Sequence, residues 1–165
     1  DYDAKFVFEA VGYNVEGSEI GAAFGLEQLK KLQQNIEVRK DNFKRQCNFF
    51  NQFKQYFSNP IETDNINTAW LAFPILINKS APFSRKEFQI YLEKRNIQTR
   101  VVFTGNIIRQ PMMKDIAHKT VENGYPNADA VMERGVLLPL HHGLTNSMFE
   151  RLHEVITEFL DDFKE

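Results

Sequence analysis

The chain has 165 residues, a formal net charge of −2 and one cysteine. This length suits a single compact domain with a sizeable core, and the balanced charge offers no long-range positive field for nucleic acid or an anionic membrane. One cysteine excludes an intrachain disulfide, no Cys/His spacing predicts a metal site, and no apolar run reaches the ~20 residues of a membrane span. We therefore expect a cytoplasmic protein. Because the chain opens without methionine on a strand-like Lys5–Phe8, we also expect it to be a piece of something longer.

The first predicted element is a long helical region over residues 18–57. It contains no proline and only two glycines, Gly21 and Gly25, and its second half places apolar residues on one stripe at helical spacing. A straight helix of about forty residues would be ~60 Å long, which overshoots a globule with a radius of gyration of ~15 Å. We therefore expect a break or bend near residues 33–37, and Ser58-Asn59-Pro60 should end the helical stretch.

The middle of the chain is predicted to form a strand, a helix and a second strand. Residues 68–77 are β-rich, and Pro74 among them indicates an edge strand or a bulge. Ser84 and Glu87 have the spacing of a capping box, so a helix should follow Ser84. Residues 97–103 are predicted as a strand that leads to a turn at Gly105.

The last third of the chain is predicted to hold two short helices, a buried strand and a long final helix. The short helices should cover residues 112–118 and 127–134, and the strand residues 135–140. Thr145 should cap the final helix, whose apolar residues recur at helical spacing from Met148 to Phe163. The whole pattern predicts an α+β fold, with helices covering one face of a small, mostly antiparallel sheet.

Polar residues in two loops are the first candidates for chemistry. Asn14 precedes the long helix, where free backbone N–H groups favour an anion such as phosphate; the structural alternative is a helix cap. Residues 99–111 gather guanidiniums, amides and hydroxyls that suit a phosphate or sugar hydroxyls. The structural alternative there is that Arg100 and Arg109 are solvated or paired with surface carboxylates.

The third candidate is the histidine pair His141-His142, which follows the predicted strand. Adjacent residues of an extended segment point to opposite sides, so the pair is a poor chelator and no metal site is expected. One histidine is suited to donate a hydrogen bond to a ligand, while the alternative is two partly buried structural histidines. Cys47 lies in the apolar stripe of the long helix and is expected to be an inert buried thiol.

The segment Gly12-Tyr13-Asn14 and the helix that follows it resemble the sugar aminotransferase family called DegT/DnrJ/EryC1/StrS, and the resemblance continues to the final helix. These are fold-type-I enzymes that use pyridoxal phosphate and act on nucleotide-linked keto sugars. The resemblance implies that residues 1–17 end the large domain, residues 18–57 form a long connecting helix, and residues 58–165 form the C-terminal small α+β domain.

One loop is similar to a narrower group, the 3-dehydrases, which remove the C3 hydroxyl of a nucleotide-linked 4-keto-6-deoxyhexose in dideoxysugar and lipopolysaccharide biosynthesis. Thr99-Arg100, Phe103, Gly105-Asn106 and Arg109-Gln110-Pro111 carry this similarity. Residues 138–144 depart from the 3-dehydrase pattern toward that of the aminotransferases, and Glu16 stands where the family commonly has a basic residue. A 3-dehydrase is therefore the first expectation, and a nucleotide-sugar aminotransferase or a non-catalytic ligand-docking fragment are the alternatives.

The resemblance also implies roles for single residues. In the family an asparagine at the position of Asn14 reaches the cofactor phosphate of the neighbouring subunit of a homodimer, and the Schiff-base lysine, or the histidine that replaces it, lies upstream. No catalytic residue is therefore expected in this segment, which alone should not turn over. The full-length enzyme should use pyridoxal or pyridoxamine 5'-phosphate, a nucleotide-linked keto sugar and glutamate as amino donor. The residues expected on the sugar-nucleotide side are Arg100, Asn106, Arg109, Gln110, His141 and His142.

Overall fold

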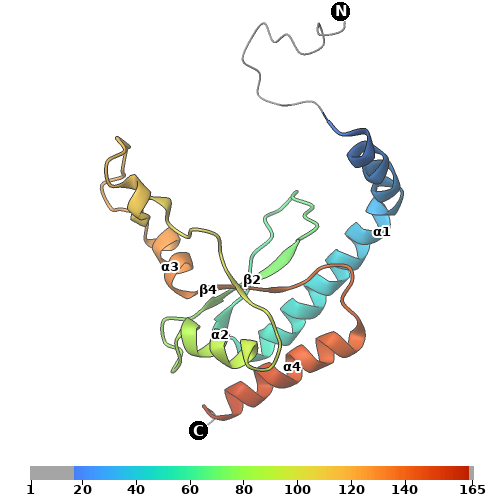
Figure 1. Ribbon diagram of the computed structural model, residues 1–165. Coiled ribbons are helices and arrows are strands. Elements are labelled where there is room, and N and C mark those ends of the chain that lie inside the picture. Colours follow the sequence, from blue (N-terminus) through green and yellow to red (C-terminus); the bar gives the residue numbers. More distant parts are fainter. Residues whose placement is uncertain (1–16, 164–165) are drawn as a thin grey trace, which may run out of the picture. The chain divides into compact units, whose positions relative to one another are not determined.

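The computed structural model describes residues 17–163, so Asn14 and the predicted strand at Lys5–Phe8 lie outside the described residues (Figure 1). The chain divides into two compact units, one that ends at Gln34 and one that begins at Asn35. The sheet and the helical segments that cover it belong to the second unit. In the first unit, every described residue is exposed to solvent.

Helix α1 spans Glu19–Phe50, and a 3-10 turn follows at Asn51–Phe53. The helix passes through residues 33–37 without a break, because no proline or glycine falls there to interrupt its hydrogen bonds. The alternative of a break is therefore wrong, while a bend stays a prediction, and the boundary between the two units falls within the same range. The helix also ends at Phe50 rather than at residue 57.

Four strands form one antiparallel sheet in the order β1-β2-β4-β3. The two central strands are β2, Ala72–Ile77, and β4, Gly135–Pro139, which pair from Ala72 opposite Pro139 to Leu76 opposite Gly135. The edge strands are short: β1 is Phe57–Ser58 and β3 is Arg100–Val101. The predicted strands over residues 68–77 and 97–103 are thus present but shorter than expected.

Pro74 lies within a central strand, where a proline would normally cost a hydrogen bond of the ladder. The edge strand β1 pairs only with Leu76 and Ile77 of β2 and does not reach Pro74. At Pro74, β2 therefore has a paired strand on one side, where Pro74 lies opposite Leu137 of β4. The expectation of an edge position is met locally at this residue, although β2 is central in the sheet as a whole.

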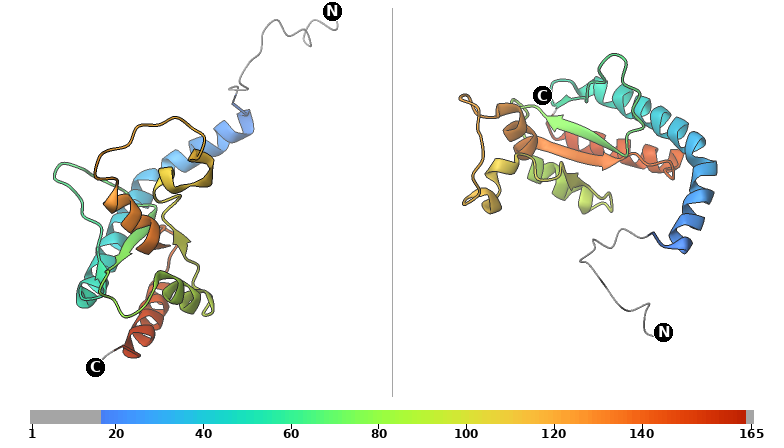
Figure 2. Two further views of the ribbon diagram at one scale, coloured as in Figure 1. Left: turned by 90° about the vertical axis from the view of Figure 1, so that its left-hand side faces the viewer. Right: turned by 90° about the horizontal axis from the view of Figure 1, so that it is seen from above.

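Helices α2, Arg85–Glu93, and α4, Asn146–Asp161, cover one face of the sheet together with the part of α1 that follows Asn35 (Figures 1 and 2). Alternate residues of β2, which are Phe73, Ile75 and Ile77, point into the resulting core. The helices contribute Phe43 and Phe50 of α1, Phe88 and Leu92 of α2, and Phe149, Leu152, Val155, Ile156, Phe159 and Leu160 of α4. The predicted α+β fold is confirmed.

Two helix starts follow the predicted cap chemistry. At α2, the backbone N–H of Glu87 donates to Oγ of Ser84 at 3.2 Å, and Oε2 of Glu87 accepts from the backbone N–H of Ser84 at 2.7 Å. At α4, Oγ1 of Thr145 accepts from the backbone N–H of Met148 at 3.3 Å. The capping box and the threonine cap are therefore both confirmed.

Helix α3, Pro126–Arg134, contacts β2 and β4 but places no side chain in the buried core. The loop before it contains two 3-10 turns, η3 at Ile107–Arg109 and η4 at Pro111–Met113. The short helix predicted over residues 112–118 is therefore reduced to the 3-10 turn η4, which overlaps only its first two residues. So short a segment has few residues to repay the cost of nucleating a helix, and here no packed face adds to its stability.

Candidate functional site

The loop that carries the 3-dehydrase resemblance is held closely against α3 at Gly105. Gly105 has a φ of +64°, and a Cβ atom there would lie 2.3 Å from Cβ and 2.5 Å from Cα of Met132. Both the backbone angle and the contact require glycine, which confirms the predicted turn. Nearby Phe103 also has a positive φ, +45°, and its side chain is 88% exposed.

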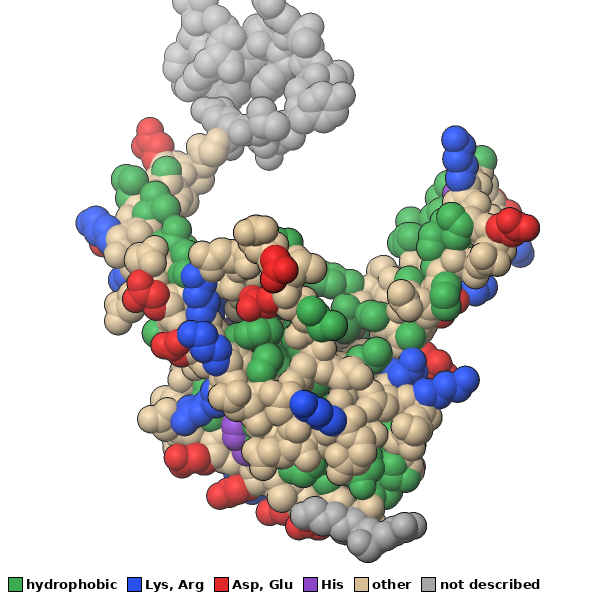
Figure 3. Space-filling view, turned by 180° about the vertical axis from the view of Figure 1, so that it is seen from behind, with side chains coloured by type: hydrophobic (Ala, Val, Ile, Leu, Met, Phe, Trp, Pro, Cys, Tyr) green, Lys and Arg blue, Asp and Glu red, His purple; other side chains and the backbone are tan. Residues whose placement is uncertain are grey.

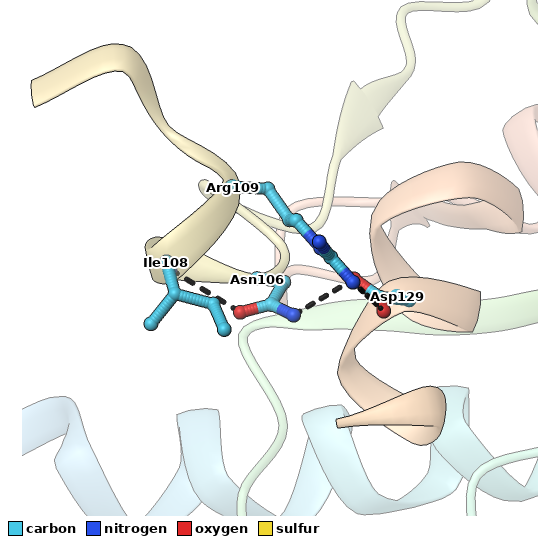
Figure 4. A network of polar contacts seen from close by, with 4 residues as sticks. All are labelled: Asn106, Ile108, Arg109 and Asp129. Carbon is cyan, nitrogen blue, oxygen red and sulfur yellow. Dashed lines mark hydrogen bonds and ion pairs between the residues drawn. The ribbon is translucent and has the colours of Figure 1, made fainter. Parts of the chain in front are cut away.

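Asn106, Arg109 and Asp129 form one polar network between this loop and α3 (Figure 4). Nε of Arg109 donates to Oδ1 of Asp129 at 3.0 Å, and Nη2 donates to Oδ2 at 2.9 Å, which is a bidentate pair. Nδ2 of Asn106 donates to the same Oδ1 at 2.7 Å, and its Oδ1 accepts from the backbone N–H of Ile108 at 3.2 Å. The carboxylate of Asp129 thus joins the loop to the helix.

The network keeps Asp129 ionised. Hydrogen bonds from Arg109 and Asn106 lower the pKa of the Asp129 carboxyl to about 2, and Asp129 in turn raises the pKa of Arg109. A guanidinium has five N–H groups, and the pair uses the edge made of Nε and Nη2. The outer edge, with Nη1, is left for another acceptor, while the carboxylate fixes the plane of the group.

Asn106 and Arg109 therefore differ in what they offer a ligand. Asn106 is only 3% exposed and is engaged at both ends of its amide, so it positions the loop. Arg109 is paired with a surface carboxylate, as the structural alternative supposed, but its side chain remains 58% exposed. Sequence reasoning missed Asp129, because it lies 20 residues from Arg109 and no motif links the two.

Gln110 and Arg100 flank this network on the side of α2. Nε2 of Gln110 donates to the carbonyl of Thr104 at 2.9 Å, and its side chain lines a small cavity of ≈150 Å³ with Gly105 and Met132. Arg100 lies in β3 opposite Leu137 and is exposed. Its side chain makes no hydrogen bond or ion pair with any residue in the described part of the chain, and it lines a larger groove beside α2.

The histidine pair lies at the other end of β4. That strand begins directly after α3 and runs for five residues before His141 and His142, a separation of ~17 Å at strand spacing. Nδ2 of Asn42 in α1 donates to the carbonyls of Leu140 and His141, at 3.2 Å each. Both histidines are exposed rather than partly buried, and within this chain the structure does not bring them to Arg109.

Other predicted features are less prominent in the structure. Cys47 is partly buried, and burial together with the Glu62 charge raises the pKa of its thiol, as an inert cysteine requires. Within residues 17–163, no group of three His, Cys, Asp or Glu side chains is placed to hold a metal ion. No helix in that range is both long and apolar enough to cross a membrane.

Apolar side chains reach the surface around α3 and the loop before it (Figure 3). Met112, Ile116 and Val121 are 65%, 48% and 53% exposed. The polar network of Asp129 therefore lies in a part of the domain whose apolar side chains are not packed into its own core.

Comparison with known proteins identifies relatives over almost the whole chain. A dTDP-4-dehydro-2,6-dideoxy-D-glucose 3-dehydratase from Saccharopolyspora spinosa is 31% identical over 96% of this chain and 34% of its own length. A dTDP-4-amino-4,6-dideoxy-D-glucose transaminase from Escherichia coli is 33% identical over 89% of this chain and 39% of its own length. The chain thus spans a little over a third of the length of these relatives.

Solved structures agree with the fold. An Escherichia coli GDP-4-keto-6-deoxy-D-mannose-3-dehydratase, with bound hydrated PLP, matches 93% of this chain and 39% of its own at 30% identity, with a TM-score of 0.74. An aminotransferase from Psychrobacter cryohalolentis matches with a TM-score of 0.80 at 16% identity, which supports the fold alone. Finally, the sequence model of the DegT/DnrJ/EryC1/StrS aminotransferase family matches residues 1–157, and this chain belongs to that family.

Proposed function

We propose that this chain is the C-terminal part of a nucleotide-sugar 3-dehydrase that acts on a 4-keto-6-deoxyhexose in dideoxysugar or lipopolysaccharide biosynthesis. The observation that carries the proposal is the loop over residues 99–111, which resembles that of the 3-dehydrases. In this loop the guanidinium of Arg109 is held by Asp129 of α3, so that its outer N–H groups are free to donate to a ligand. Relatives that are 3-dehydratases, 28–31% identical over 94–96% of this chain, support it.

In this proposal Arg109 binds the sugar. Its guanidinium is already neutralised by Asp129, so its outer edge is suited to neutral acceptors such as the hydroxyl and carbonyl oxygens of a keto sugar. Because Asp129 and Asn106 hold the group in place, little side-chain entropy is lost when a ligand binds. Gln110 follows Arg109 in the chain and lines the cavity beside Gly105, and Asn106 acts by positioning the loop.

The described residues do not by themselves fit pyridoxal phosphate. The first turn of α1 carries Glu19, whose charge opposes an anion at a helix N-terminus, and Asn14 lies outside the described residues. Apart from the amide of Asn14, we place the groups that hold the cofactor, and any catalytic residue, on the rest of the full-length enzyme. When bound, the cofactor supplies the electron sink for cleavage of the C3–O bond.

The remaining partners follow from the family and belong to the same proposal. Glutamate is the amino donor, and the full-length enzyme is a cytoplasmic homodimer in which Asn14 reaches the cofactor phosphate of the partner subunit. His141 and His142 are proposed to approach the substrate from the other end of β4, held there by Asn42.

A product assay tests the proposal. Full-length enzyme, glutamate and a GDP- or CDP-linked 4-keto-6-deoxyhexose should give a 3-deoxy sugar, identified by mass spectrometry. Arg109→Ala should raise the KM at least ~10-fold, since a charge-assisted hydrogen bond contributes ~1.5–3 kcal/mol. Arg151→Ala, at an exposed arginine of α4, is the matched control and should leave the KM unchanged. An equal KM for the two variants would contradict the role of Arg109.

The second candidate is a nucleotide-sugar aminotransferase. It is favoured by the 33% identity to the Escherichia coli transaminase and by the aminotransferase-like residues 138–144. The same assay separates the two, because transamination leaves an amino sugar and dehydration a deoxy sugar. A histidine at the upstream Schiff-base position would exclude the transaminase, and a full-length enzyme that forms neither product would leave the ligand-docking role.

A further inference from the structure

A groove of ≈790 Å³ lies between α2 and β3, on the side of α2 that faces away from the buried Phe88 and Leu92. Four cationic side chains line it, against a single carboxylate. They come from the first turn of α2, its C-terminal end and the edge strand β3. The cations are Arg85, Lys86, Lys94 and Arg100, and the carboxylate is Glu93.

The carboxylate of Glu93 is engaged on one side of the groove. Its Oε1 accepts from the backbone N–H of Thr99 at 2.6 Å and from Oγ1 of Thr99 at 3.0 Å, and Nε2 of Gln89 donates to the same hydroxyl at 3.0 Å. No ion pair in the described part of the chain joins Glu93 to any of the four cations. The groove therefore carries an excess of positive charge on a chain whose net charge is −2.

One of the cations is held in place. Nη1 of Arg85 donates to the carbonyl of Met132 in α3 at 2.7 Å, which fixes the guanidinium between the two helices. The side chains of Lys86, Lys94 and Arg100 are exposed and make no hydrogen bond or ion pair with described residues. A fixed guanidinium beside three unpaired cations is an arrangement suited to a compact anion with several oxygens.

The groove is continuous with the loop of the candidate site. Arg85 and Val101 line both the groove and the small cavity that also contains Gln110 and Gly105. A ligand seated in the groove would therefore have one end beside Gln110. Arg109, which is already neutralised by Asp129, lies on the same loop and suits uncharged oxygens, whereas the groove suits phosphates.

We infer that the groove between α2 and β3 binds the diphosphate of the nucleotide sugar, with the hexose directed toward Gln110 and Arg109. The inference rests on the proposed function for the identity of the ligand. It assigns a binding role to Arg85, Lys86 and Lys94. It also gives the two arginines of the loop region different roles, because Arg100 binds phosphate and Arg109 binds sugar.

Two simple anions test the groove directly on this chain. GDP and inorganic pyrophosphate are titrated by calorimetry at low ionic strength into the wild type and into the double variant Lys86→Ala/Lys94→Ala. The control is Lys54→Ala/Lys79→Ala, which removes two exposed lysines beside the β1–β2 end of the sheet. We expect the groove variant to bind both anions at least ~10-fold more weakly than the control, with a smaller dependence of log Kd on log salt.

Three results would overturn the inference: no binding of either anion to the wild type at millimolar concentration, equal losses in the groove and control variants, or GDP binding that Arg100→Gln and the groove variant leave unchanged. Because pyrophosphate carries no sugar and no turnover is measured, this failure is distinct from that of the proposed function. If the full-length enzyme makes the 3-deoxy sugar and its groove variant keeps the wild-type KM, the binding role of the groove is contradicted while the proposed reaction stands.

Discussion

The two parts of helix α1 contain similar numbers of apolar residues but bury them very differently. Before Gln34, Ile20, Phe24 and Leu29 are 80%, 69% and 62% exposed. After Asn35, Phe43 and Phe50 are 7% and 1% exposed and lie in the core. One continuous helix therefore belongs to two units, and apolar spacing alone does not tell which part of a helix is packed by its own domain.

The largest effect should come from truncating an aromatic side chain in the packed part. The ring of Phe50 lies 5.1 Å from that of Phe57 and 5.5 Å from that of Phe73. Phe50→Ala should lower the free energy of unfolding by ~3–5 kcal/mol, the usual cost of such a cavity, in urea denaturation followed by circular dichroism. Phe24→Ala is the matched control in the exposed part and should change it by no more than ~0.5 kcal/mol. Equal losses would show that the contrast between the two parts is wrong.

The second effect depends on pH and concerns His153, which packs against the same part of α1. Its ring stacks on Phe49 at 3.9 Å, and its Nε2 lies 2.8 Å from Oε1 of Gln46. Because an amide oxygen only accepts, the Nε2–H tautomer makes this bond. Burial first, and then the charge of Arg45, lower the pKa of His153 to about 4, from an ordinary value of 6.5.

The unfolded state therefore binds the histidine proton between pH 6.5 and pH 4, where the folded state does not, and stability should fall as the pH drops through this window. Allowing for partial exposure, we expect a loss of ~2 kcal/mol between pH 7 and pH 4 from this group. His153→Gln should lower stability at pH 7 and flatten the dependence, as measured by urea denaturation at several pH values. A variant with the wild-type slope would contradict the assignment.

A smaller effect is expected at Asn42, whose side chain joins α1 to the backbone at the end of β4, beside His141. Asn42 is 8% exposed, and its amide donates to the carbonyls of Leu140 and His141. Asn42→Ala should cost ~1.5 kcal/mol, since a buried hydrogen bond contributes ~0.5–1.5 kcal/mol. Gln28→Ala, in the exposed part of the helix, should cost nothing measurable. Amide exchange at residues 141–143 should also become faster in Asn42→Ala alone. An unchanged rate would contradict the role of the Asn42 hydrogen bonds in holding this segment.

What the sequence predicted well is chemistry between close neighbours. Ser84 with Glu87, Thr145 with Met148, and the turn at Gly105 all depend on a few consecutive residues, and all are present. The order of the elements and the α+β class follow from the same local patterns together with apolar spacing.

What the sequence did not predict depends on tertiary contacts. Asp129 meets Arg109 only because the loop packs on α3 through Gly105 and Met132. The basic groove was not predicted, because Lys86 and Lys94 look like ordinary surface residues of a helix in the sequence, and only the fold places Arg100 of β3 beside them. Helix α1 has no break at residues 33–37, and the length argument for a break or bend assumed one compact globule, whereas the chain has two units.

The smallest effect concerns the exposed part of α1 itself. A Cβ atom at Gly25 would meet nothing within 4 Å, so an alanine there fits without strain and should stabilise the helix by ~1 kcal/mol through its higher helix propensity. The gain is local, because every described residue of this unit is exposed to solvent. We therefore expect Gly25→Ala to slow amide exchange of residues 21–34 up to ~5-fold, while the urea midpoint of the sheet-bearing unit stays constant. Gly17→Ala, before the helix begins, is the control and should change neither quantity. A shift of the midpoint with Gly25→Ala would mean that the two parts of α1 unfold as one unit. They would then differ in the solvent exposure of their side chains but would not unfold independently.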